Sequence, residues 1–334
     1  MQVGIVSIGT YIPNSFMTSM ELSERSGIPK DVVENKLGIK RKPIPCEGDH
    51  TAEMGIKAAR QAFKGSEVNP EDIDLVIYIG EEHKEYPLWT ASIYTQEQLG
   101  CYNAWAFDVQ LRCGTAIMAM KVAKDMMLAD PRIKNVLLAG GYRNVDFIDY
   151  ENPRTRFMYN LGAGGAAMIL QRDYPENELL DSTLITDGTF SEDVVVVGGG
   201  TKQPMSNEIL EKQLYQLDVL DPEGMKKRLE EKSMQNFLKV IRDAVERSGF
   251  VESDIDYVAL LHMKRSAHEY VLNELGLSLD QSIYLEDYGH IGQMDQIISL
   301  ELALKQGKVK EGDVVVFVSA GIGYAWGANV IRWG

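Results

Sequence analysis

Cysteine and histidine are scarce in this sequence, and their spacing excludes several kinds of site. The 334 residues include three cysteines and five histidines. No two cysteines form a Cys-x-x-Cys pair and the histidines lack the spacing of metal ligands, so we expect no metal site. Three isolated cysteines also suit a reducing compartment better than a disulfide framework. We therefore expect a cytoplasmic protein without a bound metal.

Long hydrophobic runs and an excess of positive charge are missing as well. The longest apolar runs, such as VALL and VVVFV, are far too short to cross a bilayer. The opening residues, MQVGIVSIGTYIP, lack the basic start of a secretory leader and predict a strand and a turn. The formal net charge of -15 opposes binding to nucleic acid or anionic lipid. We expect neither nucleic acid nor a membrane as a partner.

The chain does contain a regular alternation of short β-rich runs and helical patterns. Several of the runs are continuously apolar, which is typical of strands covered on both faces. Their alternation with amphipathic segments predicts an α/β protein with layered sheets and helices. The predicted strands include VGIVSIG, IDLVIYIG, AWAFDV, NVLLAGG, GAAMIL, DVVVVGG, IDYVALLH, SIYLED, DVVVFVSA and WGANVIRW.

An internal repeat indicates two related halves. The segment AARQAFKGSEVNPEDIDLVIYIG begins at Ala58 and resembles VIRDAVERSGFVESDIDYVALLH, which begins at Val240. The offset is 182 residues without a gap, and both copies predict a helix, an acidic loop and a buried strand. We therefore predict an N-terminal half, residues 1–172, and a C-terminal half, residues 173–334, related by a pseudo-twofold axis.

The segment FDVQLRCGTAIMAM places Cys113 between a predicted strand and a predicted helix. Most lone cysteines are inert core residues, but a helix N-terminus stabilises a thiolate through its free N–H groups and dipole. The repeat places His290 at the equivalent junction of the second half, and His262 ends the repeated strand. Strand ends of open α/β sheets face a common crevice. We predict that Cys113, His262 and His290 meet there.

Five motifs in order along nearly the whole chain resemble the thiolase-fold condensing enzymes, most closely the β-ketoacyl-acyl carrier protein synthase III family. They are GIVSIGTYIPN, FDVQLRCGTAIMAM, NLGAGGAAMIL, LLHMKR and YGHIGQMDQIISLELAL, and GIGYAWGANVIRW ends the likeness. The resemblance implies a five-layered αβαβα thiolase fold and a homodimer. It implies no cofactor besides the substrates, acyl-CoA and a malonyl thioester, with an acyl carrier protein as a possible partner.

The resemblance also implies a reaction. Cys113 would be acylated from acyl-CoA and the acyl group joined to a malonyl thioester by decarboxylative Claisen condensation. His262 and His290, as neutral donors, would stabilise the enolate. Backbone N–H groups of Cys113 and Ile322 would form the oxyanion hole.

Several positions depart from the family pattern. His290 replaces the usual asparagine and gives the Cys-His-His set of the elongating synthases, which is compatible with decarboxylation. Met263, Lys264 and Arg265 replace the amide-bearing residues after the first histidine, and Val32 replaces the tryptophan that stacks on adenine. The residues that could hold coenzyme A phosphates or an acidic carrier are Lys36, Lys40, Arg41, Lys264 and Arg265.

Three other functions remain open. Glu81, in VIYIGEEH, resembles the catalytic acid and base of 3-hydroxy-3-methylglutaryl-CoA synthases, which condense without decarboxylation; it could equally be a solvated loop acid. The protein could transfer its acyl group to an oxygen or nitrogen nucleophile, with His262 as the base. It could also be a non-catalytic partner subunit, although the presence of Cys113 counts against that.

Overall fold

The computed structural model describes residues 2–322 and 324–334, and its main feature is a nine-stranded sheet that consists of two half-sheets. The half-sheets meet where β1 pairs with β8 at a single residue pair, Gly4 and Glu178. The N-terminal half-sheet has the order β5 (Trp105–Asp108), β4 (Leu75–Tyr78), β6 (Asn135–Tyr142), β7 (Gly164–Arg172) and β1 (Val3–Tyr11). The C-terminal half-sheet continues with β8 (Glu178–Thr186), β13 (Ala325–Arg332), β12 (Val314–Gly321) and β11 (Ile255–Leu260).

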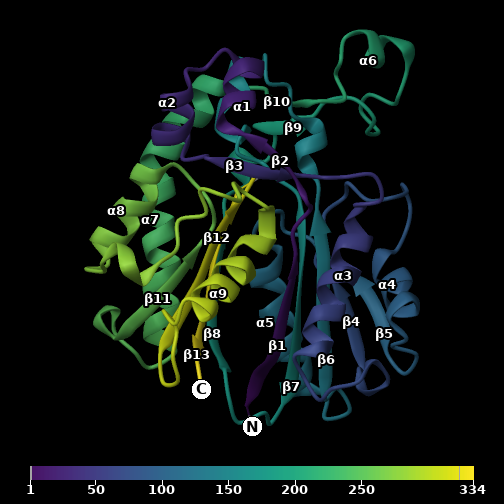
Figure 1. Cartoon of the computed structure of the whole chain (residues 1–334), viewed down its shortest axis with the longest axis vertical. Coiled ribbons are helices and arrows are strands. Elements are labelled where there is room, and N and C mark those ends of the chain that lie inside the picture. The colour runs from purple at the N-terminus through teal and green to yellow at the C-terminus, as the bar shows by residue number, and fades with distance from the viewer. Residues whose placement is uncertain (1, 323) are drawn as a thin grey trace.

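Helices lie on both outer faces and between the half-sheets, so the predicted five-layered αβαβα arrangement is confirmed (Figure 1). Strands β7 and β12 are buried along nearly their whole length because helices cover both of their faces. The N-terminal half-sheet is covered outside by α3 (Thr51–Lys64) and α4 (Ala91–Leu99), and the C-terminal one by α7 (Pro222–Arg247), with α8 (Arg265–Glu274) beside it. The central layer contains α5 (Thr115–Ala129) and α9 (Asp295–Lys305), which contact strands of both half-sheets.

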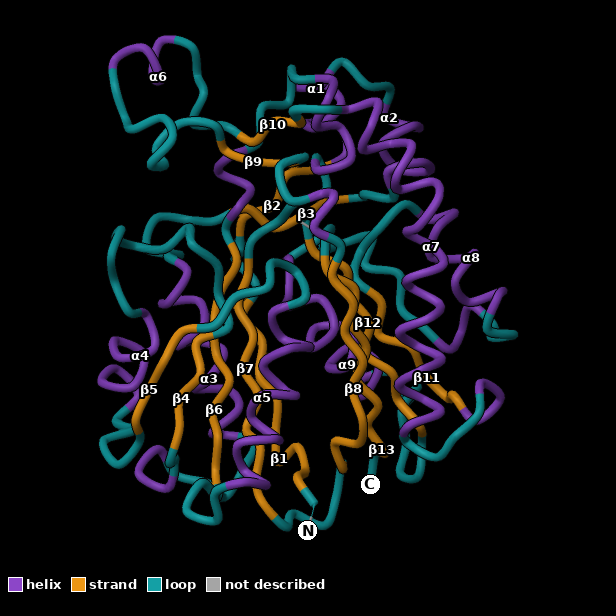
Figure 2. The backbone as a smooth tube through the Cα atoms, turned by 180° about the vertical axis from the view of Figure 1, so that it is seen from behind, coloured by secondary structure: helices purple, strands orange, loops and turns teal. Residues whose placement is uncertain are grey.

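Two smaller units lie at the top of the molecule in Figures 1 and 2. The first is built from β2 (Ser15–Thr18), α1 (Ser19–Ser26), α2 (Lys30–Val32) and β3 (Arg41–Ile44), and β2 pairs with β3. The second is a β-ribbon of β9 (Val194–Val196) and β10 (Leu217–Val219), which lies on the body, and between these two strands the loop with α6 (Asn207–Glu211) stands away from it. No helix in the described part of the chain is long and apolar enough to span a membrane.

The repeat seen in the sequence corresponds to a repeated fold, a helix followed by a 3-10 turn and a strand. Asp72 and Asp254 each accept a hydrogen bond from the backbone N–H three residues earlier, at 2.8 and 2.9 Å. Asp74 and Asp256 each accept a backbone N–H from the first residue of the neighbouring parallel strand, β6 or β12, at 2.9 and 2.8 Å. The repeated acids are therefore structural. The predicted division between residues 172 and 173 falls at the C-terminal end of β7, where the turn to β8 begins.

Glycines explain why α3 can lie directly on the N-terminal half-sheet. A Cβ atom on Gly141 would lie 2.2 Å from the carbonyl oxygen of Thr51, and one on Gly165 would lie 2.3 Å from that of Met54. A side chain at either position would push the helix away from the sheet. The NLGAGG motif thus serves helix packing at the start of β7.

Candidate active site

Cys113 lies in a tight turn between β5 and the start of α5. The turn is held by Thr115, whose Oγ1 accepts the N–H of Leu111 at 2.7 Å and donates to the carbonyl of Arg112 at 2.6 Å. Arg112 has a positive φ of 52°, which is strained for a residue with a side chain. The carbonyl of Cys113 accepts a hydrogen bond from Ser319 Oγ at 2.7 Å. These contacts fix a buried thiol at the N-terminus of the helix, as the sequence predicts.

His290 connects Cys113 to a buried carboxylate. Its Nε2 lies 3.1 Å from Cys113 Sγ, and its Nδ1 lies 2.6 Å from Asp295 Oδ2. Cysteine, histidine and aspartate in this order form the arrangement in which a base activates a nucleophile and a third group orients the base. The structure therefore brings Cys113 and His290 together across the two halves of the chain.

Asp295 is a residue of this site that the sequence analysis missed. It is fully buried at the start of α9, and it also accepts the backbone N–H groups of His262 and Ile291, both at 2.7 Å. One carboxylate thus fixes the backbone at both histidines. A signal was present, because the 182-residue offset of the repeat takes Cys113 to Asp295.

The two histidines differ in their affinity for a proton. Burial lowers the pKa of His290, but the charges of Asp295 and Cys113 and the hydrogen bonds to both outweigh it, so this pKa is well above its ordinary value. For His262, burial prevails over the hydrogen bond to the Gly38 carbonyl and lowers the pKa to about 4. His262 is therefore neutral at pH 7, whereas His290 is suited to take a proton from the thiol.

Both ring nitrogens of His262 already have protein partners. Nε2 lies 3.0 Å from the carbonyl of Gly38, and Nδ1 lies 2.9 Å from Nδ2 of Asn160. Since a carbonyl only accepts and an amide nitrogen only donates, Nε2 carries the hydrogen. The predicted role of His262 as a donor to an enolate requires its bond to Gly38 to open.

Cys113, His262, His290 and Ile322 line one cavity of about 530 Å³. Gly321 packs against the turn of Cys113 so closely that a Cβ there would lie 3.0 Å from the Cys113 nitrogen. The backbone of Gly321 is therefore held against the nucleophile, directly before Ile322. Apolar side chains form most of the remaining wall, chiefly Leu37, Phe157, Met158, Met225, Leu229, Met234, Phe237, Met263 and Tyr324.

A second groove adjoins this cavity and shares Leu37, Arg156, Phe157 and Lys264 with it. Lys36 also lines it, so Lys36 and Lys264 are placed to meet an anionic ligand that enters toward Cys113.

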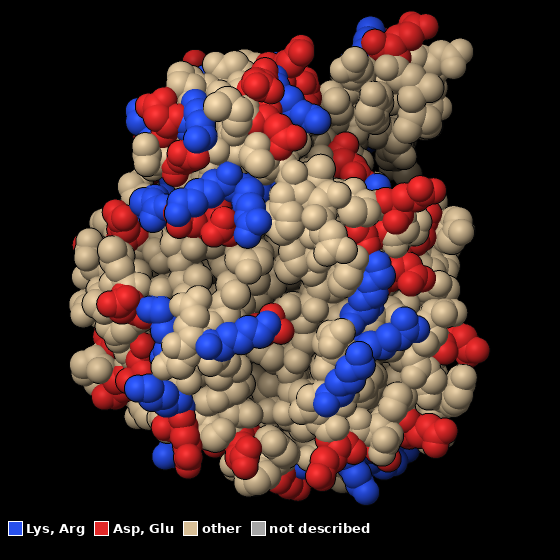
Figure 3. Space-filling model, in the orientation of Figure 1, with Lys and Arg blue, Asp and Glu red and all other residues tan. Residues whose placement is uncertain are grey.

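The other three predicted cations face carboxylates instead. Lys40 and Arg265 both bind Glu286, at 2.6 and 2.5 Å, and Arg41 lies 3.2 Å from Asp287. In Figure 3, basic side chains on the face shown lie beside acidic ones. Sequence reasoning could not predict these pairs because no local pattern joins their members. Lys40 and Arg41 lie 246 residues before their partners, and Arg265 lies 21 residues before Glu286, on a different element.

Glu81 is buried, so it is not a solvated loop acid. Its Oε2 accepts a hydrogen bond from Asn144 Nδ2 at 2.6 Å and lies 3.8 Å from Arg112 Nη1, while Oε1 has no partner among the described residues. Burial raises the pKa of Glu81, and Arg112 opposes the rise. Glu81 lines a neighbouring cavity, with Tyr78, and not the one that contains Cys113.

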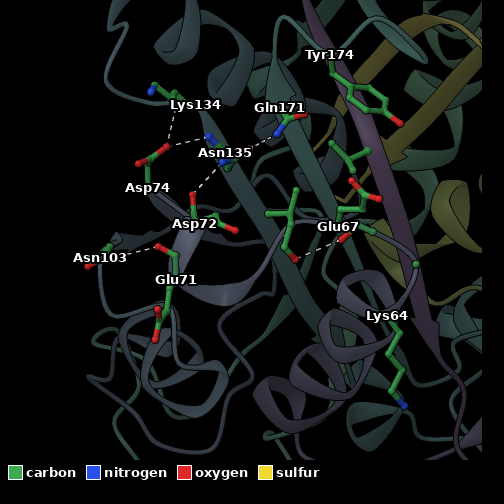
Figure 4. Close-up of a pocket in the computed structure, with 14 residues that line it drawn as sticks. Lys64, Glu67, Glu71, Asp72, Asp74, Asn103, Lys134, Asn135, Gln171 and Tyr174 are labelled. Atoms are coloured by element: carbon green, nitrogen blue, oxygen red, sulfur yellow. Dashed lines mark hydrogen bonds between the residues drawn. The ribbon is translucent and has the colours of Figure 1, made fainter.

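A larger groove of about 920 Å³ lies away from this chemistry (Figure 4). Its acidic residues include Asp74, whose carboxylate accepts the backbone N–H groups of Lys134 and Asn135 at 2.7 and 2.9 Å. Its lining contains none of the residues of the Cys113 cavity. The hydrogen bonds of Asp74 join the start of β4 to the start of β6, so its carboxylate has a structural role.

The fold, the nucleophile and the base define a thiolase-fold acyl-transferring enzyme, and comparisons with known proteins support this class. The family model for 3-oxoacyl-[acyl-carrier-protein (ACP)] synthase III matches residues 107–188, and its C-terminal counterpart matches residues 245–333. Together they match just over half of the chain. The chain belongs to the 3-oxoacyl-[acyl-carrier-protein] synthase III family.

Relatives match along the full length. The β-ketoacyl-[acyl-carrier-protein] synthase III of Aliarcobacter butzleri is 26% identical over 332 residues, covering 98% of this chain and 96% of that protein. The corresponding protein of Clostridium acetobutylicum is 27% identical, covering 99% and 98%. Among solved structures, 3-oxoacyl-[acyl-carrier-protein] synthase III of Aquifex aeolicus has a TM-score of 0.84 at 22% identity, covering 99% and 100%. OleA of Xanthomonas campestris, solved with lauric acid and lauroyl-CoA, has a TM-score of 0.82 at 19% identity, covering 100% and 99%.

Proposed function

We propose that this protein accepts an acyl group from acyl-CoA on Cys113 and joins it to a malonyl thioester by decarboxylative Claisen condensation. The observation that carries the proposal is the 3.1 Å contact between Cys113 Sγ and His290 Nε2 inside a cavity open to a cation-lined groove. Family membership supports the same chemistry. The contact also counts against a non-catalytic subunit, because a protein without activity has no need of an activated thiol.

In the first step, His290 takes the thiol proton and the sulfur attacks the thioester carbonyl. Backbone N–H groups of Cys113 and Ile322 would hold the negative charge that develops on the carbonyl oxygen. The carbonyl then re-forms, the bond to the coenzyme A sulfur breaks, and the leaving thiolate receives the proton from His290. The product of this step is an acyl thioester on Cys113.

In the second step, the malonyl thioester loses CO₂ and leaves an enolate, whose carbon attacks the acyl group on Cys113. The enolate oxygen needs hydrogen-bond donors, and His262 supplies one once Nε2–H turns from the carbonyl of Gly38 to the substrate. The bond between Cys113 Sγ and the acyl carbon then breaks with its electron pair on sulfur, and the thiolate or His290 takes one proton from water to restore the starting state.

The cavity favours acyl groups larger than acetyl. A volume of about 530 Å³ lies within the range of roughly 300–1,000 Å³ that holds a drug-sized ligand, and an acetyl group would leave most of it empty. Four methionines in its wall, Met158, Met225, Met234 and Met263, can adapt to ligands of different shape. Lys36 and Lys264 would receive coenzyme A phosphates, and an acyl carrier protein could deliver the malonyl group in a cytoplasmic setting.

A second candidate function is acyl transfer to an oxygen or nitrogen nucleophile. It is favoured by the set Cys113, His290 and Asp295 and by the two occupied nitrogens of His262. In this case His290, rather than His262 as the sequence suggested, would remove the proton from the attacking hydroxyl or amine. No enolate donor would then be needed.

The release of CO₂ separates the two candidates. Acylated enzyme mixed with carboxyl-labelled malonyl-CoA or malonyl-carrier should release label in proportion to product, and His262→Ala should slow this release by about 100-fold or more because one enolate donor is lost. Acylation of Cys113 should change little in that variant. Product formed without labelled CO₂, in the wild type, would exclude condensation by decarboxylation and favour the second candidate.

We further propose a homodimer formed along β5. In the sheet this strand pairs with β4 alone, and Trp105 on it is 52% exposed. An exposed strand edge with an aromatic side chain is suited to pair with a second copy. Trp105→Lys should convert the protein to a monomer in size-exclusion chromatography with light scattering, whereas Leu279→Lys, on the other half of the chain, should not. A wild-type monomer at micromolar concentration would contradict the proposal.

A further inference from the structure

Lys42 on β3 is a buried cation that the chemistry above does not use. The sequence places it in a basic cluster with Lys40 and Arg41, but the structure buries it completely. Its Nζ donates three hydrogen bonds, to the carbonyls of Tyr159 at 2.7 Å and Leu161 at 2.8 Å and to the hydroxyl of Tyr150 at 2.8 Å. Among residues 2–322 and 324–334, no carboxylate lies within 4.0 Å of Nζ. A buried ammonium without a counter-ion is costly, so its retention needs a reason.

The two carbonyls that Lys42 holds lie on either side of Asn160, and Asn160 touches both histidines of the site. The carbonyl of Asn160 accepts the backbone N–H of His290 at 2.8 Å, and its Nδ2 lies 2.9 Å from His262 Nδ1. Leu161 also pairs with His290 as an isolated β-bridge. The segment from Tyr159 to Leu161 is therefore the element through which Lys42 reaches both imidazoles.

The backbone beside His290 is packed against the same segment. Gly289 has a positive φ of 61°, and a Cβ there would lie 2.3 Å from the carbonyl oxygen of Asn160 and 3.2 Å from Cβ of Lys42. The loop that carries His290 therefore rests directly on Asn160 and on the stem of Lys42. A shift of Asn160 would be transmitted to His290 because no space separates them.

We propose that Lys42 is a positioning residue, whose ammonium fixes the carbonyls on either side of Asn160 and thereby holds His262 and His290 in register with Cys113. An ammonium has three N–H groups, and three acceptors surround it. A neutral amine keeps two N–H groups for the two carbonyls and can accept the Tyr150 hydroxyl, but its hydrogen bonds lack the charge that makes those of an ammonium roughly twice as strong. The strength with which Lys42 holds the segment from Tyr159 to Leu161 therefore depends on the charged form of its side chain.

The environment of Lys42 makes this charge sensitive to pH. Burial, with a smaller contribution from Arg25, lowers the pKa of Lys42 to about 7. Arg25 faces the ring of Tyr150 with its guanidinium carbon 6.0 Å from the centroid, and Lys42 Nζ lies 4.9 Å from the same centroid. Burial raises the pKa of Tyr150 to about 12, so this phenol stays neutral near pH 7. We expect the charge, and with it the stronger hydrogen bonds to the carbonyls of Tyr159 and Leu161, to be lost as the pH rises through about 7.

Three variants test the proposal, which uses the acyl transfer of the proposed function as its assay. Lys42→Met keeps a similar length and should lower kcat about 100-fold through misplaced histidines, with little change in KM. Lys42→Gln keeps two N–H donors and should recover part of the loss. Tyr150→Phe removes one acceptor and leaves both carbonyl bonds, so it should retain the wild-type rate. The decline in kcat above pH 7 should be present in the wild type and in Tyr150→Phe and absent in Lys42→Met.

The outcomes that overturn the proposal are distinct. A folded Lys42→Met protein with wild-type kcat overturns it, and so does a lower melting temperature with unchanged kcat, which assigns Lys42 to the fold alone. If Lys42→Met does not fold, a wild-type kcat in Lys42→Gln is the overturning result. If the wild type transfers no acyl group from any donor, the proposed function fails instead. The rate at which iodoacetamide alkylates Cys113 then tests this inference separately. A slower rate in Lys42→Met than in the wild type supports it, and an equal rate overturns it.

Discussion

Replacement of Cys113 by alanine is expected to abolish the acyl-enzyme and lower turnover by more than about a thousandfold, because the sulfur is the atom that carries the acyl group between the two steps. Wild-type protein incubated with a panel of acyl-CoA donors should gain the mass of one acyl group, located on the peptide that contains Cys113. The panel should favour chains longer than acetyl, since the cavity of about 530 Å³ is mostly apolar. Intact-protein and peptide mass spectrometry measure both results.

The other two cysteines provide matched controls for this experiment. Cys101 is fully buried, and burial raises its pKa to about 12, so it stays a protonated thiol at neutral pH. Cys46 is half-buried and lies 3.2 Å from Ser15 Oγ, on the small unit that contains β2 and β3. Cys46→Ala and Cys101→Ala should both keep the acyl adduct. An adduct that persists in Cys113→Ala would place the nucleophile elsewhere.

Asp295→Asn is expected to have the second-largest effect, a loss in acylation rate of about three orders of magnitude. An asparagine has one acceptor oxygen, but Asp295 accepts His290 Nδ1 and the N–H groups of His262 and Ile291. Burial lowers the pKa of His290, and the charge of Asp295 is a main effect that raises it. Without that charge, the pKa of His290 should fall toward or below its ordinary value. His290 then takes the thiol proton less readily, and the rate of Cys113 alkylation at pH 7 should fall with the acylation rate.

A buried aspartate outside the site separates this effect from loss of stability. Asp49 is also buried, and it accepts hydrogen bonds from Lys57 at 2.7 Å and Tyr11 at 2.8 Å. Asp49→Asn should lower the melting temperature to a similar degree and leave acylation unchanged. If Asp295→Asn were to acylate at the wild-type rate while folded, the orientation of His290 would not depend on this carboxylate.

The sequence could predict those parts of the molecule that depend on local pattern or on a repeated pattern. Two predicted strands are wrong or misplaced, because SIYLED forms no strand and DVVVVGG contributes only the short β9, outside the nine-stranded sheet. The correct predictions are the other strands and the placement of Cys113 and His290 in one cavity. These succeeded because strand burial and helix starts leave periodic signals in neighbouring residues. Asp295 was missed because an aspartate at the first turn of a helix is ordinary, and nothing local shows that it binds a histidine.

The charged residues show where such reasoning ends. Lys40 and Arg41 look like free cations beside each other in the chain, but each meets an acid 246 residues away. Lys42, the next residue, points inward because side chains alternate along β3. Glu81 follows a buried strand and could have been solvated, but it is buried and accepts a hydrogen bond from Asn144, 63 residues further along the chain. Pairing across the fold decides each of these cases, and no single sequence records it.

The repeat has a consequence for how the site could have become asymmetric. Cys113 and Asp295 are related by the 182-residue offset, and they lie at or next to the starts of the two central helices, α5 and α9. Two identical half-length chains around a twofold axis would have to place the same residue at both helix starts. A fused gene is free of that constraint, so one copy can hold the thiol while its sister holds the acid that serves it. Duplication followed by fusion would thus allow two positions related by the pseudo-twofold axis to diverge, one into the nucleophile and the other into the carboxylate that orients its base.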